Sequence, residues 1–320
     1  MRESREARVI GVDLGGTNIK AAAITKTGQV VTKVEWATEA DKGVEHVINR
    51  LQKIAYTVAE EAGWNWAEVT GMGIGLPGFL NFRTGVVEQA VNLGWKNTAI
   101  ISVLSESMGI PVYFDNDANA AAIGEAWVGG GQGFDHVAVA TIGTGIGGGF
   151  IINGHIVRGA NGMVGEIGHL LMEREHGRLC NCGKHGCLET ISSATAMLRS
   201  AREAVREGAQ TTLSQFALDS LTTRDVIDAA RLDDKVAYAI VKQAMETLGI
   251  ALSHIGNTLN PQRIVIGGGV SKAGEIIFEF IRKGFEQGAL PRVIEACQIV
   301  PAKLGNDAGV IGAAKLALEA

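Results

Sequence analysis

Three apolar segments of this chain each run directly into a glycine-rich turn, and this repeated pattern limits the folds that the chain can adopt. The segments read VDLGGT from residue 12, TIGTGIGGG from residue 141 and VIGGGVS from residue 265. An apolar run bounded by glycine is typical of a buried strand, and glycine lets the backbone turn tightly and approach a ligand. Glycine accounts for 43 of the 320 residues, without a collagen-like period. Similar strand–turn units in two halves would let the halves face each other across one nucleotide.

The remaining pattern predicts strands and helices throughout the chain. Strands are expected at 8–13, 14–25, 28–38, 69–78, 111–117, 136–157, 263–271 and near 296–300. Apolar residues at helical spacing predict helices at 43–62, 97–108, 118–129, 191–207, 223–231, 233–258, after 271 and from about 306. The first sheet is expected to end near Asp117, which places the boundary between a domain from residue 1 to 117 and a second domain from residue 118.

Composition and charge exclude several classes of protein. The net charge is −5, the pI is about 5.9 and no basic block is present, so the chain lacks the electrostatic footprint of nucleic-acid binding. No apolar run approaches the ~18 residues that a membrane helix needs, and no secretory signal opens the chain. We therefore expect a cytoplasmic protein, in which clustered cysteines more often indicate metal binding or catalysis than disulfides.

The glycine turns are candidate phosphate sites. DLGGTNIK, from residue 13, lacks the Gly-Lys-Ser/Thr ending of a P-loop and continues as strand, so it predicts a β-hairpin turn. The backbone N–H groups of Gly15, Gly16 and Thr17 could bind an anion, and Asp13 could hold Mg²⁺ directly or through water. An ordinary hairpin explains the same residues equally well. Further candidates lie in the other two turns: Thr144, Gly145, Gly267, Gly268 and Gly269.

An acidic segment, FDNDANAAA, ends the strand at 111–117. In an extended run Asp115 and Asp117 share a face, and Asn116 points away. Asp117 could be a rigidly held carboxylate that accepts the proton of a sugar hydroxyl as its oxygen attacks phosphorus. The alternative is that Asp117 only caps a helix that begins at Ala118.

Three cysteines lie within eight residues, at Cys180, Cys182 and Cys187. A Cys180–Cys182 disulfide would close a strained ring, and a thiol nucleophile would need only one cysteine. Three thiolates and one imidazole satisfy the tetrahedral preference of Zn²⁺, and a site with all four positions filled is structural. The candidates for the imidazole are His169, His176 and His185, of which His169 is best placed because it ends an apolar strand.

Two glutamates bracket this cluster. Glu166 precedes His169 by three residues, and Glu189 follows Cys187 by two. A metal that holds both segments would fix both carboxylates, which could then accept hydrogen bonds from vicinal sugar hydroxyls. Two solvated surface acids are the alternative.

Taken together, these segments resemble the ROK family (repressors, open reading frames, sugar kinases). VDLGGTNIK, LPG, FDNDANAAAIGE, TIGTGIGGGFIINGHIVRGANGMVGEIGH and CNCGKHGCLE occur in the family's order, from about residue 8 to the end of the chain. Within the family, CLETISSATAM is similar to the branch of bacterial glucokinases. We find no departure from the family pattern at the matched positions.

The resemblance implies a fold, an activity and a set of site residues. The fold would be a two-domain, actin-like (ribonuclease H-like) ATPase with the active site in the inter-domain cleft, and the C-terminal helix, from about 303 to 320, would return to the small domain. The activity would be ATP-dependent phosphorylation of glucose at O6, with Asp117 as catalytic base. The sugar ligands would be Gly78, Asn92, Asn116, Asp117, Glu166, His169 and Glu189. ATP and Mg²⁺ would be bound by Asp13, Gly15, Gly16, Thr17, Lys20, Thr144, Gly145, Gly267, Gly268 and Gly269, and a structural zinc by His169, Cys180, Cys182 and Cys187. One ring nitrogen of His169 would bind zinc while the other faces the sugar.

Several alternatives remain at this point. The chain could be a ROK kinase for N-acetylglucosamine, N-acetylmannosamine or fructose, a sugar sensor without turnover, or a thiol redox protein. Some ROK members are repressors with a helix–turn–helix segment, but only about seven residues precede the first strand here, so we expect none. The family commonly forms dimers or tetramers, and we expect a homodimer or homotetramer that binds neither nucleic acid nor membrane.

Overall fold

The computed structural model describes residues 7–319, which form two compact units. Within the described residues, the first unit comprises 7–133, 149–165 and 303–319, and the second comprises 134–148 and 166–302. In this division the helix after Asp117 and the segment 149–165 belong to the first unit, whereas the sequence predicts a boundary at Asp117. The domain boundaries therefore stay a prediction. Residues 1–6, where we expect no DNA-binding segment, lie outside the described residues.

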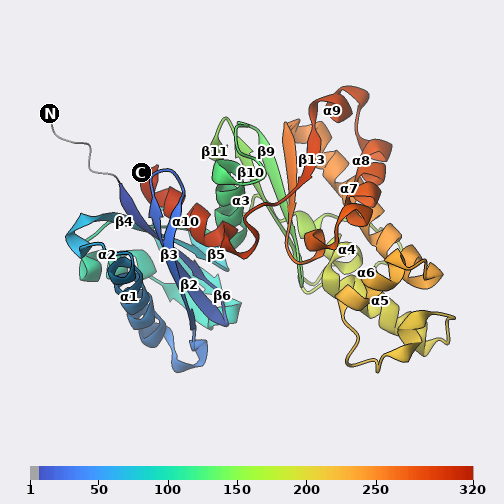
Figure 1. The fold of residues 1–320 in the computed structure, drawn as a ribbon, viewed down its shortest axis with the longest axis horizontal. Helices are drawn as coiled ribbons and strands as arrows, with labels where there is room; N and C mark the ends of the chain where they lie inside the picture. Colours follow the sequence, from blue (N-terminus) through green and yellow to red (C-terminus); the bar gives the residue numbers. More distant parts are fainter. Residues whose placement is uncertain (1–6, 320) are drawn as a thin grey trace. The chain divides into compact units, whose positions relative to one another are not determined.

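The first unit is built on a five-stranded sheet with the order β3-β2-β1-β4-β8 (Figure 1). Its strands are β1 (Arg8–Leu14), β2 (Asn18–Thr25), β3 (Val30–Ala37), β4 (Val69–Leu76) and β8 (Val112–Asn116). β1 to β3 form an antiparallel meander, and β4 and β8 run parallel to β1. The meander confirms the predicted run of three strands separated by two turns.

Helices cover both faces of this sheet. Ile10, Val12 and Leu14 alternate along β1 and join one core with helix α1 (Val44–Glu61) and helix α2 (Ile100–Met108). Val9 points to the other face, where it packs with α10 (Ala308–Leu318), and α10 in turn lies against α3 (Asp117–Val128). Because successive side chains of β1 point to opposite faces of the sheet, this strand contributes to two separate cores.

Two strand glycines bring α10 against the sheet. Gly11 and Gly73 are paired across β1 and β4. A Cβ atom on Gly11 would lie 2.0 Å from the carbonyl oxygen of Val310, and one on Gly73 would lie 1.7 Å from that of Ala313. The helix backbone can approach the strands this closely only because neither residue has a side chain.

Residues 79–98 form a small antiparallel sheet that the sequence does not predict. Its strands are β5 (Phe79–Asn81), β6 (Val86–Ala90) and β7 (Trp95–Thr98), in that order. The predicted helix at 97–108 is therefore wrong in its first turn, because β7 continues to Thr98 and α2 begins at Ile100. Also in this unit, the end of β10 (Ile146–Ile152) pairs with β11 (His155–Ile156) around the predicted Asn153–Gly154 turn.

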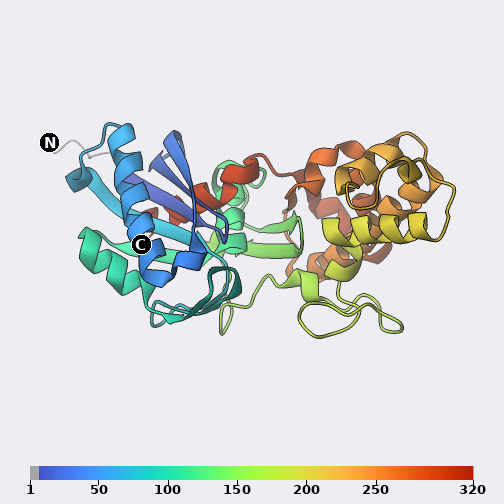
Figure 2. The same ribbon diagram turned by 90° about the horizontal axis from the view of Figure 1, so that it is seen from below.

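The second unit holds the first residues of β10 together with β9 (Val137–Ile142), β12 (Arg263–Gly267) and β13 (Gln298–Pro301), and these strands are neighbours in that order. Its helices are α4 (Glu189–Ser192), α5 (Ala194–Arg206), α6 (Thr223–Arg231), α7 (Lys235–Leu259), α8 (Glu275–Gly288) and α9 (Pro291–Ala296). α7 and α8 lie side by side (Figure 1 and Figure 2). Gly249 and Gly284 allow the close approach, since a Cβ atom on either would lie within 2.1 Å of a carbonyl oxygen of the other helix.

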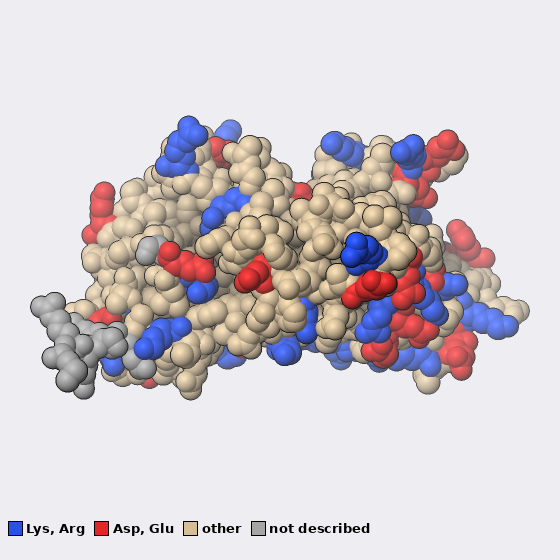
Figure 3. All heavy atoms as spheres, turned by 90° about the horizontal axis from the view of Figure 1, so that it is seen from above, with Lys and Arg blue, Asp and Glu red and all other residues tan. Residues whose placement is uncertain are grey.

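Short 3-10 helices complete both units: η1 (Ala40–Lys42), η2 (Trp66–Glu68), η3 (Val91–Leu93), η4 (Ile167–His169), η5 (Thr212–Gln215), η6 (Val270–Ala273) and η7 (Gly305–Asp307). None of the helices within residues 7–319 combines the length and apolar character needed to span a membrane. On the face shown in Figure 3, acidic and basic side chains are intermingled.

Candidate functional site

The acidic segment lies at the junction between β8 and α3 in the first unit. β8 ends at Asn116 and α3 begins at Asp117, and the Asn116 side chain is the N-cap. Its Oδ1 accepts hydrogen bonds from the backbone N–H groups of Ala118 at 2.9 Å and Asn119 at 3.4 Å. The alternative in which Asp117 is the N-cap of a helix beginning at Ala118 is therefore wrong. The Asp117 carboxylate accepts one bond from the Ala118 N–H at 2.9 Å and remains exposed.

Asp115 and Asp117 do not share an environment, contrary to the extended geometry assumed from the sequence. Asp115 is fully buried, and its Oδ2 accepts a hydrogen bond from Arg158 Nε at 2.7 Å. Its Oδ1 accepts from Asn119 Nδ2 and from the Asn116 N–H, both at 2.8 Å. The two acids diverge because the chain becomes helical at Asp117.

Desolvation by the surrounding protein raises the pKa of both carboxyl groups above the ordinary value. At Asp115 the Arg158 guanidinium opposes this effect. At Asp117 only hydrogen bonds oppose it, the first from the Ala118 N–H. Asp117 is therefore a carboxylate that is accessible to a ligand and has an increased affinity for a proton.

The first glycine turn joins β1 to β2 and contacts the loop that carries Asn92. The Gly15 N–H donates to the carbonyl oxygen of Asn18 at 2.9 Å, which closes the hairpin. A Cβ atom on Gly16 would lie 2.8 Å from the carbonyl oxygen of Asn92. Two predicted ligand segments of the first unit, the turn at 15–17 and the loop at 92, are thus in direct contact.

Thr38 holds the same turn from the opposite side. It is fully buried, its Oγ1 donates to the carbonyl oxygen of Gly15 at 2.6 Å, and its N–H donates to that of Thr17 at 2.7 Å. Sequence reasoning missed this residue, because a threonine at the end of a predicted strand is unremarkable without its partners.

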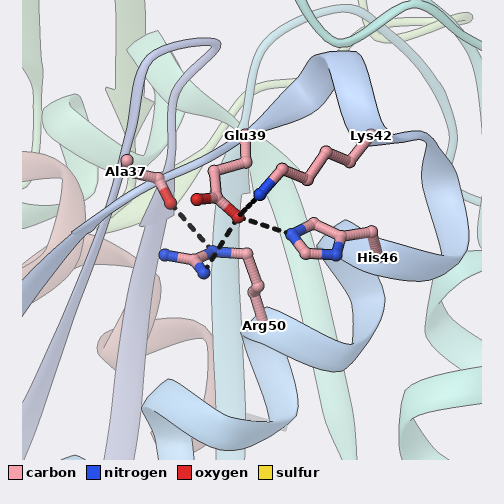
Figure 4. A network of polar contacts seen from close by, with 5 residues as sticks. All are labelled: Ala37, Glu39, Lys42, His46 and Arg50. Carbon is pink, nitrogen blue, oxygen red and sulfur yellow. Dashed lines mark hydrogen bonds and ion pairs between the residues drawn. The ribbon is translucent and has the colours of Figure 1, made fainter.

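A charged network fixes the chain immediately after Thr38 (Figure 4). The Glu39 Oε2 atom lies 3.0 Å from Lys42 Nζ, 2.6 Å from His46 Nε2 and 3.2 Å from Arg50 Nη1. Arg50 Nε also donates to the carbonyl oxygen of Ala37 at 2.9 Å. Hydrogen bonds from Lys42 and His46 lower the pKa of Glu39 to about 2. The spacing of residues 42, 46 and 50, one helical turn apart, was the signal in the sequence that could have indicated this cluster.

Asp13 and Lys20 face each other across β1 and β2. Burial and, as a smaller effect, the nearby charge of Asp117 raise the pKa of Asp13 to about 6, while Lys20 opposes the shift. Lys20 Nζ donates to the carbonyl oxygen of Asn306 at 2.6 Å and lies 3.6 Å from Asp307. The predicted phosphate ligand Lys20 thus contacts the segment before α10 in this structure, and its role toward ATP stays a prediction.

Gly78 has a conformation and surroundings that require glycine. Its φ is +123°, and a Cβ atom would lie 2.3 Å from the carbonyl oxygen of Gln89. The glycine therefore lets the chain after β4 pass directly over β6.

In the second unit, the other two glycine turns lie at the same edge of the sheet. β9 and β12 are parallel, and Gly267 is paired with Thr141, so both strands deliver their turns at their carboxyl ends. Gly268 has a φ of +85°, and a Cβ atom would lie 2.2 Å from the carbonyl oxygen of Ile142. Ligands of open α/β sheets bind at such an edge.

Glu189 contacts the turn that follows β9. Its Oε2 accepts a hydrogen bond from the Ile146 N–H at 2.9 Å. A Cβ atom on Gly145 would lie 2.2 Å from the same oxygen. Gly145, predicted as a phosphate ligand, therefore also makes room for a predicted sugar ligand, and this contact was not foreseen from the sequence.

A cavity of about 450 Å³ opens beside the turn at 267–269. Its lining includes Gly269, Lys272, Arg224 and Arg231, with Asp228 as the acidic residue. Arg231 pairs with Asp228 at 2.9 Å. The cavity is large enough for a small organic ligand and bears an excess of positive charge.

The cysteine cluster has the geometry of a four-ligand metal site. One donor atom from each of His169, Cys180, Cys182 and Cys187 lies within 4.8 Å of every other. Cys180 Sγ is 3.6 Å from His169 Nδ1, and Cys182 Sγ is 3.6 Å from Cys187 Sγ. Ligands at zinc bond lengths in a tetrahedron are separated by ~3.6–3.8 Å. The four residues could therefore hold a metal ion, and none of the chain's cysteines, all of them described, forms a disulfide.

The structure groups His169, and not His176 or His185, with the three thiols. His185 is exposed, and its Nδ1 lies 2.9 Å from the carbonyl oxygen of Gly177. With Nδ1 of His169 directed to the cysteines, its Nε2 lies 3.6 Å from Glu166 Oε2. This arrangement leaves the second ring nitrogen and the half-exposed Glu166 side by side.

We expect the purified chain to contain one zinc ion and Cys182→Ser to weaken zinc binding by more than ~100-fold, since loss of even outer partners of a metal ligand costs ~10–100-fold. Metal analysis and competition with a chelator measure this. His185→Ala is the matched control and should keep its zinc. Unchanged affinity in Cys182→Ser would contradict the site.

A second prediction concerns Asp13 and pH. Its folded-state pKa is about 6 against an ordinary 3.8, so the folded chain binds this proton more tightly than the unfolded chain. Asp13 therefore lowers folding stability progressively as pH rises from about 4 to 6, and the full cost is present above that window. Asp13→Asn should raise the free energy of unfolding at pH 8 by on the order of 3 kcal/mol and have little effect near pH 4.

Denaturant titrations without nucleotide or divalent cation measure this difference. Asp41→Asn, at an exposed position, is the control and should change the free energy of unfolding neither at pH 8 nor at pH 4. A gain for Asp13→Asn that is equal at both pH values would rule out this explanation.

Comparison with known proteins gives consistent matches over the whole chain. The model of the ROK family matches residues 9–320. A glucokinase of Halalkalibacterium halodurans is 44% identical over 308 residues, covering 95% of this chain and 92% of the relative. A glucokinase of Thermotoga maritima is 36% identical over 315 residues, covering 98% of each chain.

Solved structures agree. The crystal structure of a ROK family glucokinase from Streptomyces griseus in complex with glucose and AMPPNP matches with a TM-score of 0.80 and 32% identity, covering 98% of this chain and all of that one. This match confirms the predicted two-domain, actin-like α/β fold. The chain belongs to the ROK family.

Proposed function

We propose that this protein is a glucokinase that transfers the γ-phosphoryl group of ATP to O6 of D-glucose. The observation that carries the proposal is the β8–α3 junction, where Asn116 caps the helix and leaves the Asp117 carboxylate exposed. The similarity to glucokinases over almost the whole chain supports both the activity and the substrate.

Asp117 is the proposed base. The 6-hydroxyl group of glucose donates a hydrogen bond to the carboxylate, and its proton passes to Asp117 as O6 forms a bond to the γ-phosphorus and the bond to the ADP oxygen breaks. The raised pKa of Asp117 makes it a better proton acceptor than an ordinary carboxylate. The proton leaves Asp117 for solvent after the sugar phosphate departs.

Two groups of residues are assigned to the sugar. The first unit contributes Gly78, Asn92, Asn116 and Asp117, and the second contributes Glu166, His169 and Glu189. The Glu189 carboxylate is held by the Ile146 N–H, and Glu166 lies beside the His169 ring, so both acids have fixed neighbours. Carboxylates held in this way can accept hydrogen bonds from vicinal hydroxyl groups with little loss of side-chain entropy.

ATP is assigned to the three glycine turns. The N–H groups of Gly16 and Thr17 and the turns at 144–145 and 267–269 would contact phosphate oxygens. The Gly15 N–H already donates to the carbonyl oxygen of Asn18, so Gly15 would contribute through the close approach of its backbone. The basic cavity beside Gly269 supports a nucleotide on the second unit, since Arg224 and Lys272 lie on its wall. Mg²⁺ bound with ATP would neutralise charge on the phosphates. Asp13 is its proposed carboxylate ligand, and a cation there would favour the ionised form that burial disfavours.

Zinc in the Cys3His cluster is assigned a structural role, because four protein donors leave no open position for a substrate. Burial raises the pKa of Cys187 to about 12 in the metal-free chain, so this thiol must release its proton when the ion binds. The proposed homo-oligomeric state rests on the family resemblance, and the cytoplasmic location stays a prediction from the sequence.

Asp117→Asn should lower kcat by ~10²–10⁴-fold, because the amide cannot accept the proton. The melting temperature should not fall, since Asn116 and not Asp117 is the N-cap of α3 and the raised pKa of Asp117 means that its ionised form carries a cost in the folded chain. Steady-state kinetics with ATP and glucose, together with thermal melting, separate the two effects. Asp135→Asn, at an exposed position of the second unit, is the control. A variant that retains wild-type kcat would remove Asp117 from its proposed role.

A panel of sugars tests the substrate. We expect kcat/KM to be highest for glucose among glucose, N-acetylglucosamine, N-acetylmannosamine and fructose. If another sugar is preferred, the chain is a ROK kinase of different specificity. If none of them leads to ADP release, the chain is a sugar sensor instead of a kinase.

A further inference from the structure

The first unit contains a larger cavity that the proposed reaction does not use. Its volume is about 770 Å³, well within the range of small-molecule sites. It lies along β8, the edge strand of the first sheet, and its other walls are the β5–β6 turn, α2, β11 and the end of α10. None of the predicted sugar, nucleotide or metal ligands lines it.

The charged side chains of this cavity favour an anion. Arg83 and Arg158 carry permanent positive charges, and His155 is a third basic group on the wall. The acidic side chain on the wall, Glu319, lies 3.4 Å from Lys315 Nζ, which compensates its charge. Two guanidinium groups facing one cavity are suited to a phosphate group, because each can donate parallel hydrogen bonds to two oxygens.

The other lining groups favour a sugar-like body attached to that anion. Thr84, Ser102 and Tyr113 present hydroxyl groups, and the ring of Phe82 offers an apolar surface. Hydroxyl groups both donate and accept, as the hydroxyl groups of a sugar do. A flat apolar ring can pack against the C–H face of such a molecule.

Arg158 links the cavity to the β8–α3 junction. Its guanidinium lies 5.2 Å from the centre of the Phe82 ring, and its Nε donates to the buried Asp115. The Nη atoms of Arg158 make no hydrogen bond to any residue that the structure describes, so they are available on the cavity side. Asp115 has no contact with solvent, so it depends on this bond for its neutralising charge.

Asp115 is in turn bonded to the start of α3. Its Oδ1 accepts from the Asn116 N–H and from Asn119 Nδ2. A ligand that draws the Arg158 guanidinium toward the cavity would weaken the support of Asp115, and the residues that position Asp117 would then rearrange. The side chains of Arg158 and Asp115 thus connect the cavity to the backbone directly before Asp117.

We propose that this cavity binds a small phosphorylated sugar or polyol and that its occupancy changes turnover at Asp117 through the Arg158–Asp115 pair. The phosphate group contacts Arg83 and Arg158, and the hydroxyl groups contact Thr84, Ser102 and Tyr113. The effect on turnover rests on the proposed glucokinase activity, whereas binding does not.

Binding is tested by calorimetry on the full chain with glucose present at saturation to occupy the sugar site. The probes are fructose 6-phosphate, inorganic phosphate and fructose. We expect fructose 6-phosphate to bind, fructose not to bind, and Arg83→Ala to weaken binding by roughly 10- to 100-fold. Lys53→Ala, at an exposed position of α1 outside the cavity, is the matched control.

Absence of fructose 6-phosphate binding at millimolar concentration, or equal binding by wild type and Arg83→Ala, would overturn the site. Inorganic phosphate that binds as tightly as the sugar phosphate would overturn the sugar part of the proposal.

Turnover is measured with and without fructose 6-phosphate. Fructose 6-phosphate should change the kcat of the wild type. It should leave the kcat of Arg158→Lys unchanged, because this variant keeps a positive charge beside Asp115 but loses the guanidinium fork. Arg83→Ala should keep the basal kcat and lose the response. A wild-type kcat that is unaffected at saturating ligand would overturn the coupling. If the chain does not phosphorylate glucose at all, the glucokinase proposal fails while the binding result still decides the site.

Discussion

The close packing of helix α10 against the first sheet is the constraint on which most of the first unit depends. Gly11 and Gly73 are paired across two strands and leave this part of the sheet without side chains. A methyl group on either residue would collide with the helix backbone. Overpacking of this kind costs ~1–3 kcal/mol or more, so a larger residue at either position would destabilise the unit. The same helix brings Gly309 under Asp13 and the segment 306–307 to Lys20, so residues from both ends of the chain meet at one edge of the unit.

A second constraint is the buried charge of Asp115. A carboxylate without solvent is stable only when hydrogen bonds and an opposite charge surround it, and here Arg158, Asn119 and the Asn116 N–H supply them. This network sits directly before Asp117. The exposed acid therefore follows closely after a desolvated neighbour whose side chain is held by three partners. Removing Arg158 would leave a buried charge unpaired, and the damage would be expected first at the start of α3.

Much of this arrangement was predictable from residues 8–25 and 136–157, because their apolar runs and glycine turns have few alternative structures. The sequence could not predict that Asn116 and not Asp117 is the N-cap, since both side chains cap well. The choice depends on which residue ends β8. The sheet at 79–98 was missed because its strands are only three to five residues long, too short for a periodic pattern to stand out. Thr38 was missed for a different reason, because its partners at 15–17 are distant in sequence and side-chain bonds to a turn leave no periodic signal. The Glu39 network was missed although its partners at 42, 46 and 50 follow a regular spacing, because that spacing alone does not identify their common acceptor.

In the cysteine cluster, backbone hydrogen bonds and a bound metal ion would both position the segments around His169 and Glu189. Leu188 N–H donates to the carbonyl oxygen of Leu170 at 2.8 Å, and Leu171 and Cys187 form a β-bridge. These bonds already align the segment after His169 with the segment before Glu189. The four donor atoms then converge within 4.8 Å, so an ion would add stability to an arrangement that the backbone has specified. Glu189 gains its final orientation from the Ile146 N–H at the glycine turn after β9. The carboxylate is thus held by two elements, and a change in the turn at 143–145 would reach the proposed sugar site as readily as loss of the metal.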